Sequence, residues 1–190
     1  MRQILVSLLA FTASLLCGCF PLSLNPIYTE QDRLFLPQLM GAWAAEDSQS
    51  WTFTAGDSGS YRLELRGDQG EVSLFRAQLA RVEGILLLDL FPVGPDEDAV
   101  EELTQMHLMK LHSFAVVHQI EPLLKMSFMQ QDWLEKYLER HPGSLGSMRR
   151  DDRLILTAST SDLQKFVIRQ LQTEGAFFEP EELRRMSDED

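Results

Sequence analysis

The sequence predicts a mainly β domain with C-terminal helices (α+β), in which an antiparallel meander of about eight strands closes into a barrel. Three observations carry this prediction. Apolar and polar residues alternate with period two from Gly41 to about residue 129, and short turns rich in Gly and Asp separate the alternating runs. Beyond residue 130 the period becomes that of helices. With 190 residues, the chain is long enough for one domain with a sizeable core.

The N-terminal 19 residues, which come before this pattern, have the features of a targeting signal. Arg2 is followed by an apolar run of 13 residues from Ile4 to Leu16, and then by Leu16-Cys17-Gly18-Cys19. This arrangement resembles the signal peptide of a bacterial lipoprotein, with Cys19 as the lipidated residue. The resemblance implies cleavage after Gly18, acyl chains such as palmitate on Cys19, and attachment to the membrane through this lipid.

The position after Cys19 refines the expected location. Residue 20 is Phe rather than Asp, which by the same resemblance favours an outer-membrane protein that faces the periplasm, if the cell has an outer membrane. Two alternatives stay open, an ordinary secretory signal and a membrane-spanning helix. The apolar run is shorter than the roughly 20 residues that cross a bilayer, which argues against the membrane-spanning helix.

The charge of the chain argues against nucleic acid and anionic lipid as partners, and its cysteine content argues against a disulfide. The net charge is −12, and removal of residues 1–18, which carry Arg2 and no acidic residue, makes it −13. A chain this acidic and without a basic cluster is not expected to bind nucleic acid or anionic headgroups. Cleavage would leave Cys19 as the single cysteine, so no disulfide is expected.

These signals divide the chain into four parts. Residues 1–18 are the expected signal peptide, and residues 19–36 read as a lipid-anchored tether, since Pro21, Ser23, Asn25 and Pro26 show little periodicity. Residues 37–176 form the expected barrel-plus-helix domain. Residues 177–190 are expected to hold a short helix and an acidic tail.

The strands follow from alternation and turn chemistry. Residues 51–54 and 61–66 are half-buried strands, and residues 72–79 form a third strand with an expected bulge near residue 74. Residues 85–91 are apolar on both faces, so a later helix is expected to cover them. An acidic connection follows at 92–106, with an expected helical turn over 98–105, before two more strands at about 107–120 and 122–129.

The C-terminal third is predicted to be mostly helical. Asp132 and Glu135 indicate a capping box at the start of a helix that Pro142 ends. Residues 153–158 read as one last strand. A second helix is expected from Ser161, with Gln164 three residues on, to Gly175, and a third, short helix from Pro180 through Arg185.

The order of strands and one short motif point to a family. Seven meander strands, a helix and a final strand resemble the lipocalin barrel over about 41–158, and Gly41-Ala42-Trp43 is similar to the Gly-x-Trp of the first lipocalin strand. The resemblance implies that Trp43 packs across the closed end of a barrel. The whole chain also resembles small bacterial lipoproteins without an assigned role.

A lipocalin-like barrel could enclose a cavity for one small apolar ligand. The side chains expected to face inward and contact it are Trp51, Phe53, Tyr61, Leu63, Leu65, Phe114 and Val116. The alternative is that the same side chains simply fill the barrel as its core.

Catalytic and metal motifs are not found. His107, His112, His118 and His141 lack the spacing of a metal site, Gly143-Ser144-Leu145-Gly146 lacks a strand-to-helix elbow, and Asp96-Glu97-Asp98 does not continue as an EF-hand. We therefore expect no enzyme, cofactor or metal. The expected function is that of a lipid-anchored envelope protein that binds a small apolar ligand. The alternative is an accessory lipoprotein with a solid barrel that binds another envelope protein through its surface, for which the acidic stretches 96–102 and 179–190 are candidates.

Overall fold

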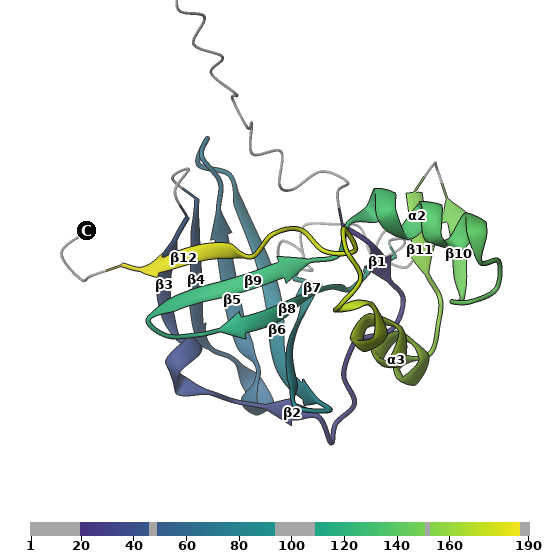
Figure 1. Ribbon diagram of the computed structural model, residues 1–190. Coiled ribbons are helices and arrows are strands. Elements are labelled where there is room, and N and C mark those ends of the chain that lie inside the picture. The colour runs from purple at the N-terminus through teal and green to yellow at the C-terminus, as the bar shows by residue number, and fades with distance from the viewer. Residues whose placement is uncertain (1–19, 46–48, 94–108, 151–152, 187–190) are drawn as a thin grey trace, which may run out of the picture.

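Eight antiparallel strands close into a barrel, as the sequence predicts (Figure 1). The computed structural model describes residues 20–45, 49–93, 109–150 and 153–186. Each strand pairs with its two neighbours, and pairing of β6 with β7 completes the circle. The barrel strands are β3 (Gly41–Ala44), β4 (Ser50–Ala55), β5 (Tyr61–Arg66), β6 (Val72–Val82), β7 (Ile85–Pro92), β8 (Ser113–Gln119), β9 (Leu123–Phe128) and β12 (Glu181–Arg185).

The eighth strand, β12, occupies the segment for which a short helix was predicted, and that prediction is wrong. Glu181–Arg185 is rich in residues that favour helices, but β12 pairs antiparallel with both β3 and β9. Without it, two strand edges would expose unpaired backbone groups. Leu183 is fully buried in the barrel, while Glu182 and Arg184 are exposed. Tertiary pairing therefore overrides local helix propensity.

One end of the barrel is closed by a short 3-10 helix, η1 (Pro37–Leu39), and by two stacked side chains. Trp43 is fully buried, and its indole N–H donates to the Leu39 carbonyl over 3.0 Å. The Arg185 guanidinium lies 4.1 Å from the Trp43 ring centroid. It donates to the Met40 and Gln38 carbonyls over 2.7 and 2.6 Å. Gly41 has a φ of +116°, which residues with a Cβ rarely adopt, and a Cβ there would lie 2.7 Å from Nη1 of Arg185.

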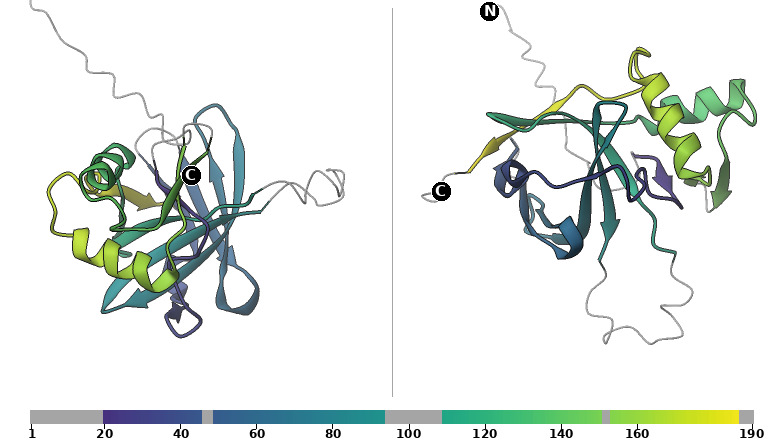
Figure 2. Two further views of the ribbon diagram at one scale, coloured as in Figure 1. Left: turned by 90° about the vertical axis from the view of Figure 1, so that its right-hand side faces the viewer. Right: turned by 90° about the horizontal axis from the view of Figure 1, so that it is seen from below.

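A second layer covers the outer face of β7 and β8 (Figure 2). It consists of a small sheet in the order β1-β11-β10 and of two helices. Leu87 and Phe114 of the barrel wall pack there with Leu134, Phe166 and Val167 of the helices. This confirms the prediction that a helix covers the doubly apolar strand 85–91. The elements are β1 (Leu22–Ser23), α2 (Gln131–Arg140), β10 (Ser147–Arg150), β11 (Arg153–Leu156) and α3 (Thr160–Gln170).

The late strand predicted at 153–158 exists, but it lies outside the barrel. As β11 it pairs in parallel with β1 and antiparallel with β10. The sequence 129–180 is thus an insertion between β9 and β12 that builds the second layer.

The prediction of a tether over residues 19–36 is wrong for the residues that the structure describes. Residues 20–36 are part of the domain: β1 pairs with β11, and β2 (Arg33–Leu34) pairs with β6. Ile27 is fully buried. The Asn25 amide donates to the Ala158 carbonyl over 2.8 Å, and the Gln164 amide donates to the Ile27 carbonyl over 2.9 Å. Proline-rich, aperiodic sequence here encodes a segment fixed by long-range contacts rather than a free linker.

The predictions of a bulge near residue 74 and of a capping box at Asp132 are also wrong. Strand β6 keeps a continuous register with β5 and β7, so there is no bulge near residue 74, and the irregularity lies in β8 between Val117 and Gln119. Helix α2 has Gln130 at its N-cap, and Glu135 accepts from Gln131 rather than completing a capping box with Asp132.

Helix α3 begins at Thr160 rather than Ser161, and the Ser159 hydroxyl caps it by accepting from the Asp162 N–H over 3.2 Å. The helix ends at Gln170, and Gly175 lies in the turns beyond it. The predicted signal peptide, Cys19, the helical turn over 98–105 and the tail 187–190 lie outside the described residues. Among the described residues, no helix is long and apolar enough to cross a bilayer.

We expect Arg185→Ala to lower the free energy of unfolding by about 1–2 kcal/mol, because it removes two charge-assisted hydrogen bonds and the stacking on Trp43. Urea unfolding followed by tryptophan fluorescence measures the change. Arg62→Ala, on the exposed face of β5, is the matched control and should change stability by less than about 0.5 kcal/mol. Equal losses in the two variants would contradict a special role for Arg185.

Candidate functional site

The predicted ligand residues separate into two groups. Trp51, Phe53, Tyr61, Leu63 and Leu65 belong to the apolar cluster inside the barrel, as predicted. Phe114 and Val116 do not.

Phe114 and Val116 belong to the cluster outside the barrel, beneath the helices, and their assignment to the interior is wrong. The inward residues of β8 are Ala115 and Val117. Residues 114–117 are all apolar and buried, so alternation could not reveal which face is inside. The barrel interior covers one face of β8 and the second layer covers the other, so both faces are shielded from solvent.

Towards its closed end the barrel is filled with side chains. Phe53, Tyr61 and Leu63 are at most 1% exposed. The Tyr61 hydroxyl accepts from the Leu36 N–H over 2.7 Å and donates to the Leu36 carbonyl over 3.1 Å. Burial raises the pKa of this hydroxyl above its ordinary value. These three predicted ligand residues are therefore core.

A small cavity lies at the opposite, open end of the barrel. Its volume is about 50 Å³. Apolar side chains form most of its wall, and polar side chains contribute the rest. The lining residues are Phe20, Gln49, Trp51, Leu65, Arg66, Phe75, Leu90, Ser113, Phe128 and Glu181. Of the predicted ligand residues, Trp51 and Leu65 are in this wall.

Phe20 is the member of this wall that comes from the N-terminal segment. Its ring stacks on Phe128 with centroids 4.3 Å apart, and it meets Phe178 edge-on at 6.3 Å. Phe20 also packs against the interior cluster of the barrel. A side chain of the N-terminal segment thus occupies apolar space at the barrel mouth.

The size of the cavity limits what can bind while Phe20 is in place. A cavity that holds benzene has a volume of about 150 Å³. Pockets for larger organic ligands are about 300–1,000 Å³. The 50 Å³ present is too small for either, so a ligand needs the space that Phe20 now fills.

Sequence reasoning missed Phe20, Phe75, Leu90 and Phe128. The sequence pattern places Phe20 in the predicted tether, because no apolar periodicity around it indicates a packed segment. The other three are apolar residues of β6, β7 and β9, and the register of the closed barrel brings them together.

A buried contact between a carboxylate and a histidine fixes the N-terminal segment to the outside of the barrel. Asp89 of β7 is 1% exposed, and one of its carboxylate oxygens accepts from the Ile27 N–H over 3.0 Å. The other lies 2.7 Å from Nδ1 of His112. Backbone bonds of 2.8 Å in both directions join His112 to Ser23. Asp89 and His112 therefore hold residues 23–27, just beyond Phe20, against the barrel.

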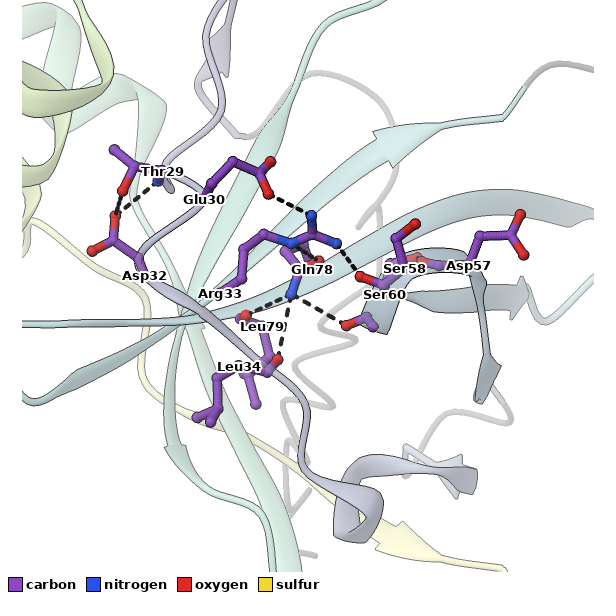
Figure 3. A network of polar contacts seen from close by, with 11 residues as sticks. Thr29, Glu30, Asp32, Arg33, Leu34, Asp57, Ser58, Ser60, Gln78 and Leu79 are labelled. Carbon is purple, nitrogen blue, oxygen red and sulfur yellow. Dashed lines mark hydrogen bonds and ion pairs between the residues drawn. The ribbon is translucent and has the colours of Figure 1, made fainter.

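A polar network near the closed end holds β2 (Figure 3). The buried Gln78 amide donates to the Leu34 and Leu79 carbonyls, and its oxygen accepts from Arg33 over 3.0 Å. Arg33 also pairs with Glu30 over 2.7 Å and donates to the Ser58 carbonyl. The side chains of this network bond to one another and to backbone, which is the arrangement of a structural clamp.

Asp32 lies beside this clamp and faces helix α3. Its carboxylate accepts from the Thr29 hydroxyl and N–H over 2.6 and 2.8 Å, and from the Gln164 amide over 2.9 Å. Burial acts to raise the pKa of Asp32, but these hydrogen bonds outweigh it and hold the pKa below its ordinary value.

The other described histidines are apart from the mouth and from each other. The His118 imidazole lies 2.8 Å from the Ser127 hydroxyl, and burial lowers its pKa. His141 stacks on Tyr137 with ring centroids 4.4 Å apart. No three His, Cys, Asp or Glu side chains come together as metal ligands within the described ranges. Ser144 lies exposed in the turn after α2, while His107 and residues 96–98 fall outside those ranges.

Comparison with known proteins finds no family model, no curated protein and no solved structure that matches this chain.

We expect Asp89→Ala to lower the free energy of unfolding by about 3 kcal/mol, because it leaves the Ile27 N–H and the His112 ring without their buried partner. Urea unfolding measures the loss, and faster hydrogen exchange of the Ile27 amide locates it. Asp132→Ala, at an exposed position in the first turn of α2, is the control. Unchanged exchange at Ile27 would contradict the assignment.

Proposed function

We propose that this protein is a lipid-anchored component of the cell envelope whose lipocalin-like barrel binds a small apolar ligand at its open end. The acyl chains on Cys19 would attach it to the membrane, and the domain would face the periplasm in a cell with an outer membrane. The cavity closed by Phe20 is the single observation that carries the ligand-binding part.

The chemistry of the cavity supports an apolar ligand. Trp51, Leu65, Phe75, Leu90 and Phe128 supply carbon surface, and burial of such surface contributes about 25 cal/mol per Å². Phe20 itself is a model for the ligand, since its ring already fills part of this space by stacking on Phe128. An aromatic ring or a short acyl segment has matching shape and polarity.

The contacts of Phe20 explain how the ligand would enter. Phe20 is held by aromatic contacts with Phe128 and Phe178, whereas the chain from Leu22 onward is held by backbone pairing and by Asp89. Movement of residues 20 and 21 would therefore expose the cavity without loss of the barrel, of the pairing of β1 or of the Asp89–His112 contact.

A second candidate function rests on the filled interior near the closed end. Phe53, Tyr61 and Leu63 leave no space there, as in a solid barrel that serves as a scaffold for another envelope protein. The two functions differ in whether an apolar molecule can replace Phe20, and this difference can be measured.

We expect Cys19→Ser to release the protein from membranes into the soluble periplasmic fraction, because the substitution removes the thiol that carries the lipid. Cell fractionation measures the release, and the intact mass of the unsubstituted protein reports the acyl chains. Retention of the variant in the membrane would instead support an uncleaved apolar helix at residues 4–16.

We expect Phe20→Ala, made in the Cys19→Ser chain to avoid detergent, to bind N-phenyl-1-naphthylamine about tenfold more tightly than its parent. The probe would no longer compete with a stacked ring, a contact of about 1.5 kcal/mol. Titration of probe fluorescence measures the dissociation constant.

Phe35→Ala is the matched control, because Phe35 stacks on Tyr61 at 4.8 Å near the closed end. It should leave probe binding unchanged. Failure of both the parent and Phe20→Ala to bind the probe would reject the ligand-binding function and favour the solid scaffold.

A further inference from the structure

Exposed apolar side chains gather on the rim of the open end. Val72, Val93, Met109 and Phe178 are large apolar residues that are 48%, 49%, 43% and 38% exposed. Val72 is the first residue of β6, Val93 and Met109 lie in the connection from β7 to β8, and Phe178 lies in the return from β9 to β12.

Three of the four rim residues are tied to the wall of the cavity by backbone pairing. Val72 pairs with Arg66, and the Val93 N–H donates to the Leu74 carbonyl next to Phe75. The Phe178 N–H donates to the Phe128 carbonyl over 2.9 Å.

Met109, the fourth rim residue, lies a few residues before Ser113 of the cavity wall. Val72, Val93 and Phe178 therefore lie beside the wall of the cavity, and β2 lies at the other end of the barrel (Figure 1).

The chain enters the domain at the same rim. Phe20 lies in the mouth, and a trans peptide bond holds consecutive Cα atoms only about 3.8 Å apart. Acyl chains on Cys19 would therefore start directly beside the mouth. The expected attachment to the membrane and the exposed apolar side chains thus lie on one side of the molecule.

We propose that the open end of the barrel docks onto the bilayer, with Val72, Val93, Met109 and Phe178 in its interfacial layer. The proposal rests on the membrane anchor of the proposed function, and it adds a defined orientation. An anchor next to a hydrophilic surface would let the domain turn freely, whereas an apolar rim favours contact with the acyl region.

The negative charge of the chain determines which lipid headgroups the rim can approach. With a net charge near −12, the protein is repelled by anionic headgroups, so apolar contact with zwitterionic lipid must provide the attraction.

Docking in this orientation deepens the proposed function. It places the cavity under Phe20 at the level of the lipid, so a bilayer acyl chain is the apolar group with the shortest path into the barrel. The closed end, with η1, Trp43 and Arg185, would point away from the membrane.

Site-specific fluorescence tests the orientation. The full chain would carry a single added cysteine at Val72→Cys, Met109→Cys or Phe178→Cys, labelled with nitrobenzoxadiazole and reconstituted into phosphatidylcholine vesicles. Phe35→Cys and Met148→Cys, at exposed apolar positions away from the rim, are the matched controls. The chain without an added cysteine reports labelling of Cys17 or Cys19.

We expect the emission of the three rim labels to shift to shorter wavelength on vesicles, and their quenching by aqueous iodide to fall, while both control labels stay unchanged. Iodide quenching of the rim labels equal to that of the controls would overturn the proposal. A shift at every position would also overturn it, since the domain would then have no fixed orientation.

The outcome is independent of the two tests of the proposed function. An uncleaved helix in place of a lipid would still attach the full chain to vesicles, and the labels would still report the orientation. A barrel that fails to bind N-phenyl-1-naphthylamine could likewise still dock. A rim covered by a protein partner instead of lipid would leave the rim labels unshifted on pure phosphatidylcholine.

Discussion

Pairing of β12 between β3 and β9 is the interaction on which the rest of the structure depends. A meander of seven strands leaves two open edges, and each exposes unpaired N–H and C=O groups. Strand β12 satisfies both edges with a segment that follows β9 only after about fifty residues. Its position also delivers Arg185 to Trp43 and η1, so the same strand that closes the sheet laterally closes one end of the barrel.

The insertion that precedes β12 gives the barrel its second layer, and the N-terminal segment joins the two layers. Strand β1 pairs with β11 of the insertion, and Ser23 bonds to His112 at the edge of the barrel. Asp89 would be costly to bury alone, but the Ile27 N–H and His112 satisfy it. These contacts fix the direction in which the chain approaches the mouth, and hence the position of Phe20.

The open end brings together every feature that points to function. Most of the interior is filled, and the described cavity of about 50 Å³ lies where Phe20 contacts Phe128. The exposed rim residues and Phe20, which follows the proposed lipidation site, belong to the same end. A barrel with the proposed ligand site, the apolar rim and the proposed anchor at one end would be well arranged to exchange an apolar group with a bilayer. A soluble carrier would need a deeper cavity that protects its ligand from water.

The sequence by itself determined the strands from Gly41 to Phe128, the two helices and the need to cover the strand at Ile85–Pro92. Alternation and helical period report which faces of a segment are apolar, and those faces are local properties. Only the tertiary structure decided that Glu181–Arg185 is a strand, that residues 20–36 belong to the domain and that Phe114 faces outward. It also decided that Phe20 fills the mouth. Each of these depends on a partner distant in sequence, and no local period records which partner an apolar face or an unpaired edge will meet.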